Sequence, residues 1–344
     1  MKLRAGFRFL VLLFTLYSLL ITVNSCGPTY PKEKIKESVI KVCRNEYDLD
    51  VKVETSGKTI AIYLPLTDLI DFTFALTKSA SDKINDVLLS VSRVTLSTDA
   101  KFDYYCVIAH DVRIPELQII IIKSVEDVKR LFVSDISRGE YLKRMLIDLR
   151  LSPQSQKERA VKEILGKMNL DERWQEEMMN DFFRSEPTAL SDIGYWNGRF
   201  YIKDITKAEF LSEQLANRLK LVFREDKTLS DDFTIKFAKG TYISKEKERF
   251  FKFTISTKPK SGVLAEADDS FGKIFGPCLK EISNVLHGYG FTDFDHVEIL
   301  NEGDGRMLKV SRDELEGFRK KKIKLENIVS KMQNYNEISI PITR

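Results

Sequence analysis

The chain of 344 residues has few of the residues and motifs by which enzymes are often recognised. It contains only three histidines and four cysteines. It has no glycine-rich phosphate-binding loop, no nucleophile elbow, no HExxH motif and no CxxC pair. None of these recognised motifs therefore predicts a catalytic residue, a metal site or a cofactor. Catalytic groups can still converge from distant positions, so a carboxylate-based site stays open.

The chain also lacks a strong excess of charge of one sign. Its 55 lysines and arginines nearly balance its 51 aspartates and glutamates, which gives a formal net charge of +4. A dedicated nucleic-acid surface normally needs a basic excess. We therefore expect no nucleic-acid partner.

The one long apolar run follows a basic head at the N-terminus. The head contains Lys2, Arg4 and Arg8, and the run from residue 9 to residue 23 carries no charge. This order of segments is typical of an export signal rather than of a folded element. We predict that residues 1–25 are a signal peptide, whose removal lowers the formal charge from +4 to +1.

The end of this run, Val23-Asn24-Ser25-Cys26, resembles the cleavage motif of bacterial lipoproteins. Val23 matches the aliphatic residue three positions before the cysteine, and Ser25 matches the small residue directly before it. The resemblance implies cleavage between Ser25 and Cys26. It also implies lipid attachment to the Cys26 sulfur, and often to the new amino terminus. Two or three acyl chains hold a protein stably on a membrane, because each buried methylene contributes about 0.8 kcal/mol.

The resemblance covers this segment alone, but it implies a location. The protein would be exported and anchored in the bacterial cell envelope, with membrane lipid as its first partner. In bacteria with two membranes, Gly27 after the cysteine suits the outer membrane. Residues 26–32, with Pro28 and Pro31, suit a short irregular tether. Two other interpretations stay open, namely an ordinary secretory signal with a free Cys26 thiol and an uncleaved membrane-spanning anchor.

The remaining cysteines do not predict a disulfide-built scaffold. With Cys26 lipidated, Cys43, Cys106 and Cys278 are left, and an odd number cannot all pair within one chain. A Cys43–Cys106 bridge stays possible, because spacing alone does not decide it. Cys106 is in phase with the apolar side of its predicted strand, and Cys278 falls in an apolar helix. We therefore predict that both are core thiols.

Past the tether, the same order of elements occurs twice. Hydrophobic periodicity predicts a helix, two strands, a helix and two strands in each copy. In the first copy these elements fall at 33–44, 50–54, 59–64, 81–96, 102–109 and 117–123, and in the second at 208–223, 232–237, 250–256, 270–287, 295–300 and 307–310. Ser124 and Ser311 then each begin the Ser-x-x-acid pattern of a capping box. The repetition predicts an internal duplication.

The segment between the copies differs in composition. It predicts three short amphipathic helices at 140–151, 155–168 and 172–183, followed by a hairpin with a type I′ turn at Asn197-Gly198. The aromatic residues around Trp196 favour packing between the domains, with glycan or partner stacking as the alternative.

These elements predict an α+β fold of two related helix–hairpin–helix–hairpin domains with mostly antiparallel sheets, joined by a helical insert. We expect no long crossovers, with helices on one face of each sheet. The predicted segments are the signal peptide 1–25, the tether 26–32, a first α+β domain 33–138, the helical insert 139–187, the hairpin with a second α+β domain 188–318, and a basic helix end with a C-terminal strand 319–344.

Two polar groups are candidates for function. His296 and Glu298 stand two residues apart, so both point to the same side of a strand, with Asp293 and Asp295 nearby. This group suits cation binding or proton transfer, and a solvated strand edge explains it equally well. The basic run 319–322 suits either anionic headgroups or the solvated face of a helix.

Together, these observations favour a lipid-anchored envelope protein that binds or scaffolds an envelope protein partner. An envelope hydrolase with a carboxylate-based site, acting on glycan or peptide, is the alternative. A purely structural lipoprotein that self-associates through its sheet edges is a third possibility. A deep pocket that gathers acids, or a histidine with an acid, would favour the hydrolase. A flat surface with an uncovered strand edge would favour the binding module.

Overall fold

The computed structural model describes residues 29–71, 75–114, 116–151, 190, 193–245, 248–260, 267–331 and 333–334. The predicted signal peptide with Ser25 and Cys26, the helices predicted at 155–168 and 172–183, and the strand predicted at 336–343 lie outside these residues. Within the described part of the chain, no helix combines the length and the apolar character that crossing a membrane requires.

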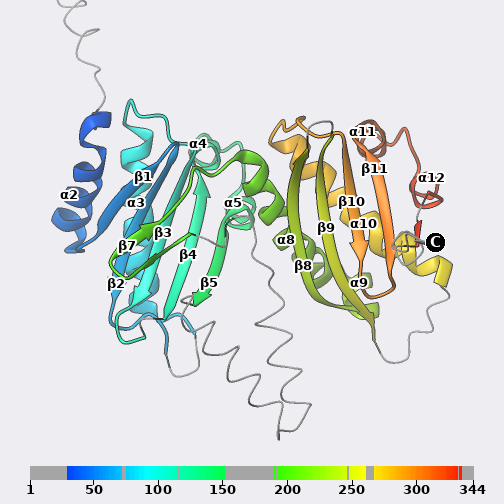
Figure 1. Cartoon of the computed structure of the whole chain (residues 1–344), viewed down its shortest axis with the longest axis horizontal. Coiled ribbons are helices and arrows are strands. Elements are labelled where there is room, and N and C mark those ends of the chain that lie inside the picture. The colour runs from blue at the N-terminus through cyan, green and yellow to red at the C-terminus, as the bar shows by residue number, and fades with distance from the viewer. Residues whose placement is uncertain are drawn as a thin grey trace, which may run out of the picture.

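The first half of the fold is a five-stranded sheet with its helices (Figure 1). After a short 3₁₀ helix at Lys32–Lys34, its elements are α2 (Ile35–Tyr47), β1 (Lys52–Ser56), β2 (Thr59–Leu66), α3 (Lys78–Leu96), β3 (Tyr104–Asp111), β4 (Leu117–Ser124), α4 (Val125–Phe132), α5 (Arg138–Arg144) and β5 (Leu146–Leu151).

A small hairpin and a second five-stranded sheet follow. Their elements are β6 (Gly194–Trp196), β7 (Arg199–Tyr201), α8 (Lys207–Glu225), α9 (Lys227–Asp232), β8 (Phe233–Lys245), β9 (Glu248–Pro259), α10 (Ala267–Gly288), β10 (His296–Asn301), β11 (Arg306–Ser311), α11 (Arg312–Arg319), α12 (Leu325–Val329) and β12 (Gln333–Asn334).

The fold is therefore mixed α+β with open sheets, and its strand pairs are mostly antiparallel as predicted. The strand orders are β1-β2-β3-β4-β5 and β8-β9-β10-β11-β12. Each sheet holds one parallel pair, β2–β3 in the first and β9–β10 in the second. The expectation of no crossovers is wrong, because α3 and α10 each cross from one strand to its parallel neighbour. A parallel pair needs such a connection, since its strands start at the same end of the sheet.

The two sheets also share backbone contacts at corresponding points. In the first sheet, the Asp103 amide donates to the Lys58 carbonyl at 2.9 Å. In the second, the Asp295 amide donates to the Arg249 carbonyl at 2.7 Å. Both bonds join the residue before the crossover's second strand to the start of its first strand, since Lys58 directly precedes β2 and Arg249 is the second residue of β9. The repeated order of elements thus corresponds to repeated pairing in space.

The helix starts that follow β4 and β11 differ. Ser311 and Glu314 form the predicted capping box at the start of α11. Ser124 lies at the same position before α4, but its side chain makes no capping hydrogen bond, so this prediction is wrong. The acid three residues after Ser124 is Asp127, whose carboxylate binds Arg144 and Tyr289 instead.

The helix predicted at 140–151 is correct only in its first half. The chain leaves the helical conformation at Met145, and Leu146–Leu151 forms strand β5, which pairs antiparallel with β4. A local pattern of leucines and charged residues suits either a helix or a strand. Pairing with β4 decides between them, because it supplies backbone hydrogen bonds along the whole segment.

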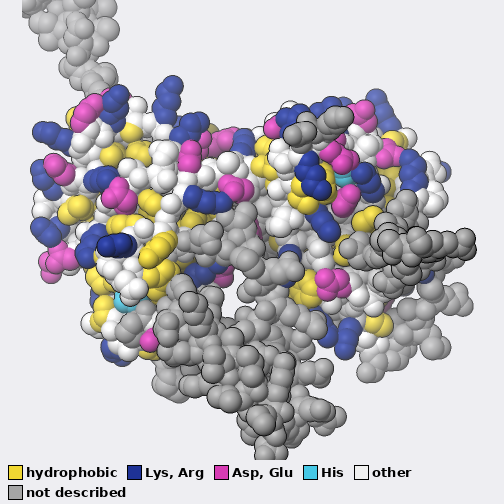
Figure 2. Space-filling view, viewed as in Figure 1, with side chains coloured by type: hydrophobic (Ala, Val, Ile, Leu, Met, Phe, Trp, Pro, Cys, Tyr) yellow, Lys and Arg dark blue, Asp and Glu magenta, His cyan; other side chains and the backbone are white. Residues whose placement is uncertain are grey.

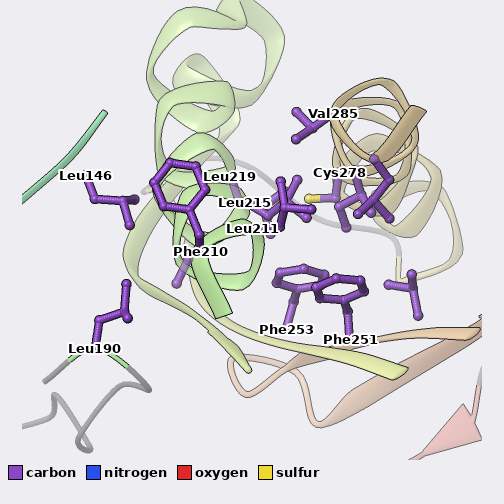
Figure 3. Close-up of a cluster of buried hydrophobic side chains, with 14 of the residues drawn as sticks. Leu146, Leu190, Phe210, Leu211, Leu215, Leu219, Phe251, Phe253, Cys278 and Val285 are labelled. Atoms are coloured by element: carbon purple, nitrogen blue, oxygen red, sulfur yellow. The ribbon is translucent and has the colours of Figure 1, made fainter. Parts of the chain in front are cut away.

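Two apolar cores stabilise the fold. One lies between the first sheet and helices α2 and α3. The other runs continuously from the opposite face of the first sheet, past the β6–β7 hairpin and α8, to the second sheet and α10. In Figure 3, Phe251 and Phe253 of β9 face Leu211 and Leu215 of α8 and Cys278 of α10. Because this core includes side chains from both sheets, the halves share a common interior.

A buried polar network also joins the halves. Arg144 of α5 donates to the Asp127 carboxylate of α4 at 2.7 Å, and its guanidinium lies 4.5 Å from the centre of the Tyr289 ring. The Tyr289 hydroxyl donates to Asp127. From α8, Gln214 donates to the Tyr289 hydroxyl at 2.8 Å and to the Arg144 carbonyl at 2.9 Å. Burial raises the pKa of the Asp127 carboxyl, and the bonds from Tyr289 and Arg144 oppose that shift.

Replacing Arg144 should strongly destabilise the protein. The side chains of Arg144 and Asp127 are 7% and 2% exposed, so Arg144→Met leaves a buried carboxylate without its cation. Breaking a buried pair in this way costs about 3–5 kcal/mol, which urea unfolding measures. The control is Lys143→Met, whose exposed pair with Glu225 should contribute at most about 1 kcal/mol. Equal losses in the two variants would contradict the role given to the network.

A buried lysine should make stability depend on pH. Lys123 of β4 is 8% exposed, and its ammonium lies 4.9 Å from the centre of the Tyr141 ring. Burial lowers the pKa of Lys123 to about 8. Between about pH 8 and pH 10.4, the unfolded state therefore binds more protons than the folded state, so this residue's contribution to stability rises with pH.

The Lys123→Met variant tests this pH dependence. Between pH 7 and pH 10.5, Lys123 should add roughly 2–3 kcal/mol to the free energy of unfolding of the natural protein, and the variant should lack this gain. Comparing the two proteins by urea unfolding at each pH cancels the titration of all other groups. A difference between the two proteins that does not change with pH would show that Lys123 has the same pKa in the folded and unfolded states.

Candidate functional site

The β6–β7 hairpin covers the face of the first sheet that lies away from the helices. The turn residues Asn197 and Gly198 have φ values of 51° and 78°, which confirms the predicted type I′ turn. Gln118 of β4 fastens the hairpin, because its side chain accepts from the Tyr195 amide at 3.0 Å and donates to the Tyr195 carbonyl. The Tyr195 ring stacks on Tyr63 of β2, with 3.8 Å between the ring centres. The aromatic hairpin is thus a cover for this sheet.

The corresponding face of the second sheet has no described element lying over it (Figure 1). The register places Ala61, Cys106 and Ile122 side by side across the first sheet, all three buried. The same row of the second sheet is Lys252, Glu298 and Lys309. Figure 2 shows basic and acidic side chains among apolar ones on this half of the molecule. The two sheets therefore present opposite chemistry at equivalent positions.

This charged row borders a histidine that is almost completely buried. His296 is 4% exposed and stacks on Phe250, with 4.5 Å between the ring centres. One ring nitrogen, Nε2, lies 3.2 Å from the Glu298 carboxylate, and Nδ1 lies 3.4 Å from that of Glu248. Lys309 Nζ lies 3.2 Å from Glu248 and 3.8 Å from Glu298. The site thus combines a histidine, two carboxylates and an ammonium group.

The prediction that His296 and Glu298 share one side of a strand is confirmed. The other two predicted members do not join them, because both contact Arg249. Asp295 accepts the Arg249 amide at 2.7 Å, and Asp293 pairs with the Arg249 side chain. Local sequence patterns do not identify Glu248 and Lys309 as members, since only the pairing of β9 and β11 with β10 brings them to His296.

The arrangement suits polar recognition better than metal binding. Among the described side chains, no group of three or more His, Cys, Asp or Glu residues is placed to hold a metal ion. Glu248 and Lys309 have half-exposed side chains, at 47% and 50%. They can exchange their contact with each other for contacts with a partner.

A cleft of about 260 Å³ lies elsewhere, between the end of α10, the loop that follows it and α11. Leu286, Phe291 and Leu315 are among its apolar lining residues, and His287 and Arg312 are among its polar ones. Its volume is below the 300–1,000 Å³ typical of small-molecule sites. We therefore do not assign the candidate site to this cleft.

The three cysteines of the folded body are free and fully buried. Cys43 lies in the core on the α2 side of the first sheet, whereas Cys106 belongs to the core on the opposite side. The Cys43–Cys106 bridge that the sequence left open therefore does not form. Burial raises the pKa of the Cys106 and Cys278 thiols to about 12, which makes them poor nucleophiles and confirms both as core thiols.

The basic run at residues 319–322 lies at the end of α11. The helix ends at Arg319, and Lys321 has a φ of 59°, which stops it. Arg319 and Lys320 both pair with Glu316, at 2.7 and 3.0 Å. These two cations therefore pair with a neighbouring acid. Only Arg319 of the run is helical, so the alternative that the run is the solvated face of a helix is wrong.

In comparisons with known proteins, no family model, curated protein or solved structure matches this chain.

Proposed function

We propose that this protein is a lipid-anchored protein of the bacterial cell envelope that acts as a binding or scaffolding module. The anchor rests on the sequence Val23-Asn24-Ser25-Cys26, in which Val23, Ser25 and Cys26 match a lipoprotein cleavage site and Asn24 departs from it. The folded body begins very soon after Cys26, since the Tyr30 amide already donates to the Ser97 carbonyl. A body carried this close to its modified residue is consistent with direct attachment to a membrane.

The two halves, whose sheets run from β1 to β5 and from β8 to β12, are two related α+β domains that arose by duplication. Equal strand order, one parallel pair at the same place in each sheet, and equivalent backbone hydrogen bonds at Asp103 and Asp295 support this relation. Among the described residues, a hairpin lies over the open face of the first sheet and not over that of the second. Duplication followed by divergence accounts for one face that is covered and one that is charged.

The binding surface is the row Lys252, Glu298 and Lys309 with its neighbours on the second sheet. The single observation that carries this assignment is the replacement of a buried apolar row by a charged row at equivalent positions. The occupant we propose is an extended or hairpin segment of an envelope protein, rich in carboxylates. The chain offers a precedent, because its own β6–β7 hairpin lies on the equivalent face of the first sheet. The two lysines of the row supply charge complementarity.

The alternative of an envelope hydrolase draws on one observation, the meeting of His296 with Glu248 and Glu298. A histidine with acids is a common catalytic combination. However, these groups lie on a sheet face, and the cleft described above is lined by other residues. The geometry therefore favours binding over hydrolysis.

The lipid anchor predicts a specific mass for the mature protein. Expressed in a bacterial host, the chain should begin at Cys26 and carry a diacylglyceryl group with a further acyl chain. Globomycin, which inhibits the lipoprotein signal peptidase, should cause the precursor to accumulate. The Cys26→Ser variant should lose both the lipid and the membrane attachment. An unmodified chain cut before Cys26 would mean soluble secretion, and retention of residues 1–25 would mean an uncleaved anchor.

The binding surface predicts site-specific crosslinking in intact cells. A photoreactive amino acid at Thr254, which lies at the centre of β9 on the same face as Lys252, should form an adduct with an envelope protein. Reversing the row with Lys252→Glu and Lys309→Glu should reduce this adduct by about tenfold, because like charges then face an acidic partner. The matched control places the same amino acid at Leu89 of α3, which is 60% exposed on the far side of the first sheet.

Three results would contradict the proposed surface. They are an equal yield at Leu89, an adduct that survives the charge reversal in a folded variant, and crosslinking to glycan rather than protein. The last result would instead favour the hydrolase.

A further inference from the structure

The start of the folded body is fastened to one particular loop, which connects α3 to β3. The Tyr30 amide donates to the Ser97 carbonyl at 3.3 Å, and Tyr30 pairs with Thr98 as an isolated bridge. The Lys32 amide donates to the Asp99 carboxylate at 2.8 Å. The Tyr30 side chain also packs against the core beneath this loop. The entry point of the chain into the body is therefore fixed.

The distance from this entry point to the lipid attachment residue is short. Only Gly27 and Pro28 separate Cys26 from Thr29, the first described residue. Fully extended chain covers at most about 3.6 Å per residue, so the Cα atoms of Cys26 and Thr29 are at most about 11 Å apart. A tether of this length cannot place the body far from the membrane or let it turn over.

The loop lies at an end of the molecule to which both halves contribute elements. It joins β3 at Asp103, whose carbonyl accepts the first amide of α4. From α4, Arg130 donates to the Gly288 carbonyl at 2.8 Å, at the end of α10. Figure 1 shows α4 and α11 at this same end, above the two sheets, and Figure 2 shows basic and acidic side chains along it. This mixed charge suits contact with the hydrated headgroup layer, and not insertion into the acyl region.

We infer that this end, made of loop 97–103, α4, the loop after α10, and α11, lies against the membrane surface. The inference rests on the proposed lipid anchor at Cys26. The strands then extend away from the bilayer, because β3 starts at this end and ends at Asp111, at the opposite end of the sheet. The charged face of the second sheet stands roughly upright from the membrane, where a protein partner in the envelope can reach it.

Paired single cysteines test this orientation. Lys101→Cys lies in the loop beside the entry point, and Glu116→Cys lies beyond the other end of β3; both positions are exposed. Eight residues of strand place them roughly 26 Å apart. The buried Cys43, Cys106 and Cys278 do not compete for the reagent, because none of them is exposed. The two variants therefore differ chiefly in their distance from the anchor.

The lipidated protein is placed in phosphatidylcholine vesicles and treated with a bulky polyethylene glycol maleimide. Labelling at Lys101→Cys should be slower than in detergent by an order of magnitude, whereas labelling at Glu116→Cys should hardly change. A spacer of about 30 glycine and serine residues after Pro28 should restore labelling at Lys101→Cys, because it extends the reach of the tether.

Each outcome separates the orientation from the anchor. Equal labelling of the two variants in a sample whose mass includes the lipid would overturn the orientation and leave the proposed anchor intact. A sample whose mass lacks the lipid would overturn both. Shielding at Lys101→Cys that persists with the spacer would also overturn the inference, since it would assign the protection to something other than the short tether.

Discussion

The buried contact between Arg144 and Asp127, completed by Tyr289 and Gln214, is the interaction on which the arrangement of the two halves depends. It joins α4 and α5 of the first half to α8 and the end of α10 in the second. Burying an ion pair carries a large desolvation cost, so the net contribution of the intact pair is smaller than the loss that follows when one partner is removed. Here the network specifies how one sheet lies relative to the other. The contact between α4 and the end of α10, through Arg130 and the Gly288 carbonyl, accompanies that placement.

The two halves have the same strand order but differ in the side chains on one face of the sheet. In the first, the row Ala61, Cys106 and Ile122 lies under a hairpin that Gln118 holds through its backbone. In the second, Lys252 and Lys309 flank Glu298 on a face without such a cover among the described residues. A row of apolar side chains needs burial, whereas a row of charges needs water or a partner. The same strand order thus gives a covered sheet face in one half and a charged sheet face in the other.

The candidate site was only partly predictable. The alternation of residues in a strand places His296 and Glu298 on one side, and this required no knowledge of the fold. Glu248 and Lys309 lie on separate strands. Glu248 reaches His296, 48 residues further along the chain, because β9 pairs with β10, and Lys309 reaches it because β10 forms a hairpin with β11. Asp293 and Asp295 are close in sequence but turn toward Arg249. Closeness in sequence therefore did not predict which acidic side chains lie beside His296.

By itself, the sequence determined the type and order of most elements, because apolar periodicity, the Asn197-Gly198 turn and the Ser311 capping box act over a few residues. It also carries the N-terminal pattern around Cys26, which no fold is needed to recognise. Tertiary structure alone decided that β2 and β3 run parallel, that Leu146–Leu151 is a strand, and which sheet face the hairpin covers. These outcomes depend on hydrogen bonds and apolar contacts between residues distant in sequence. Local patterns favour a helix or a strand, but they do not show which distant element that helix or strand packs against.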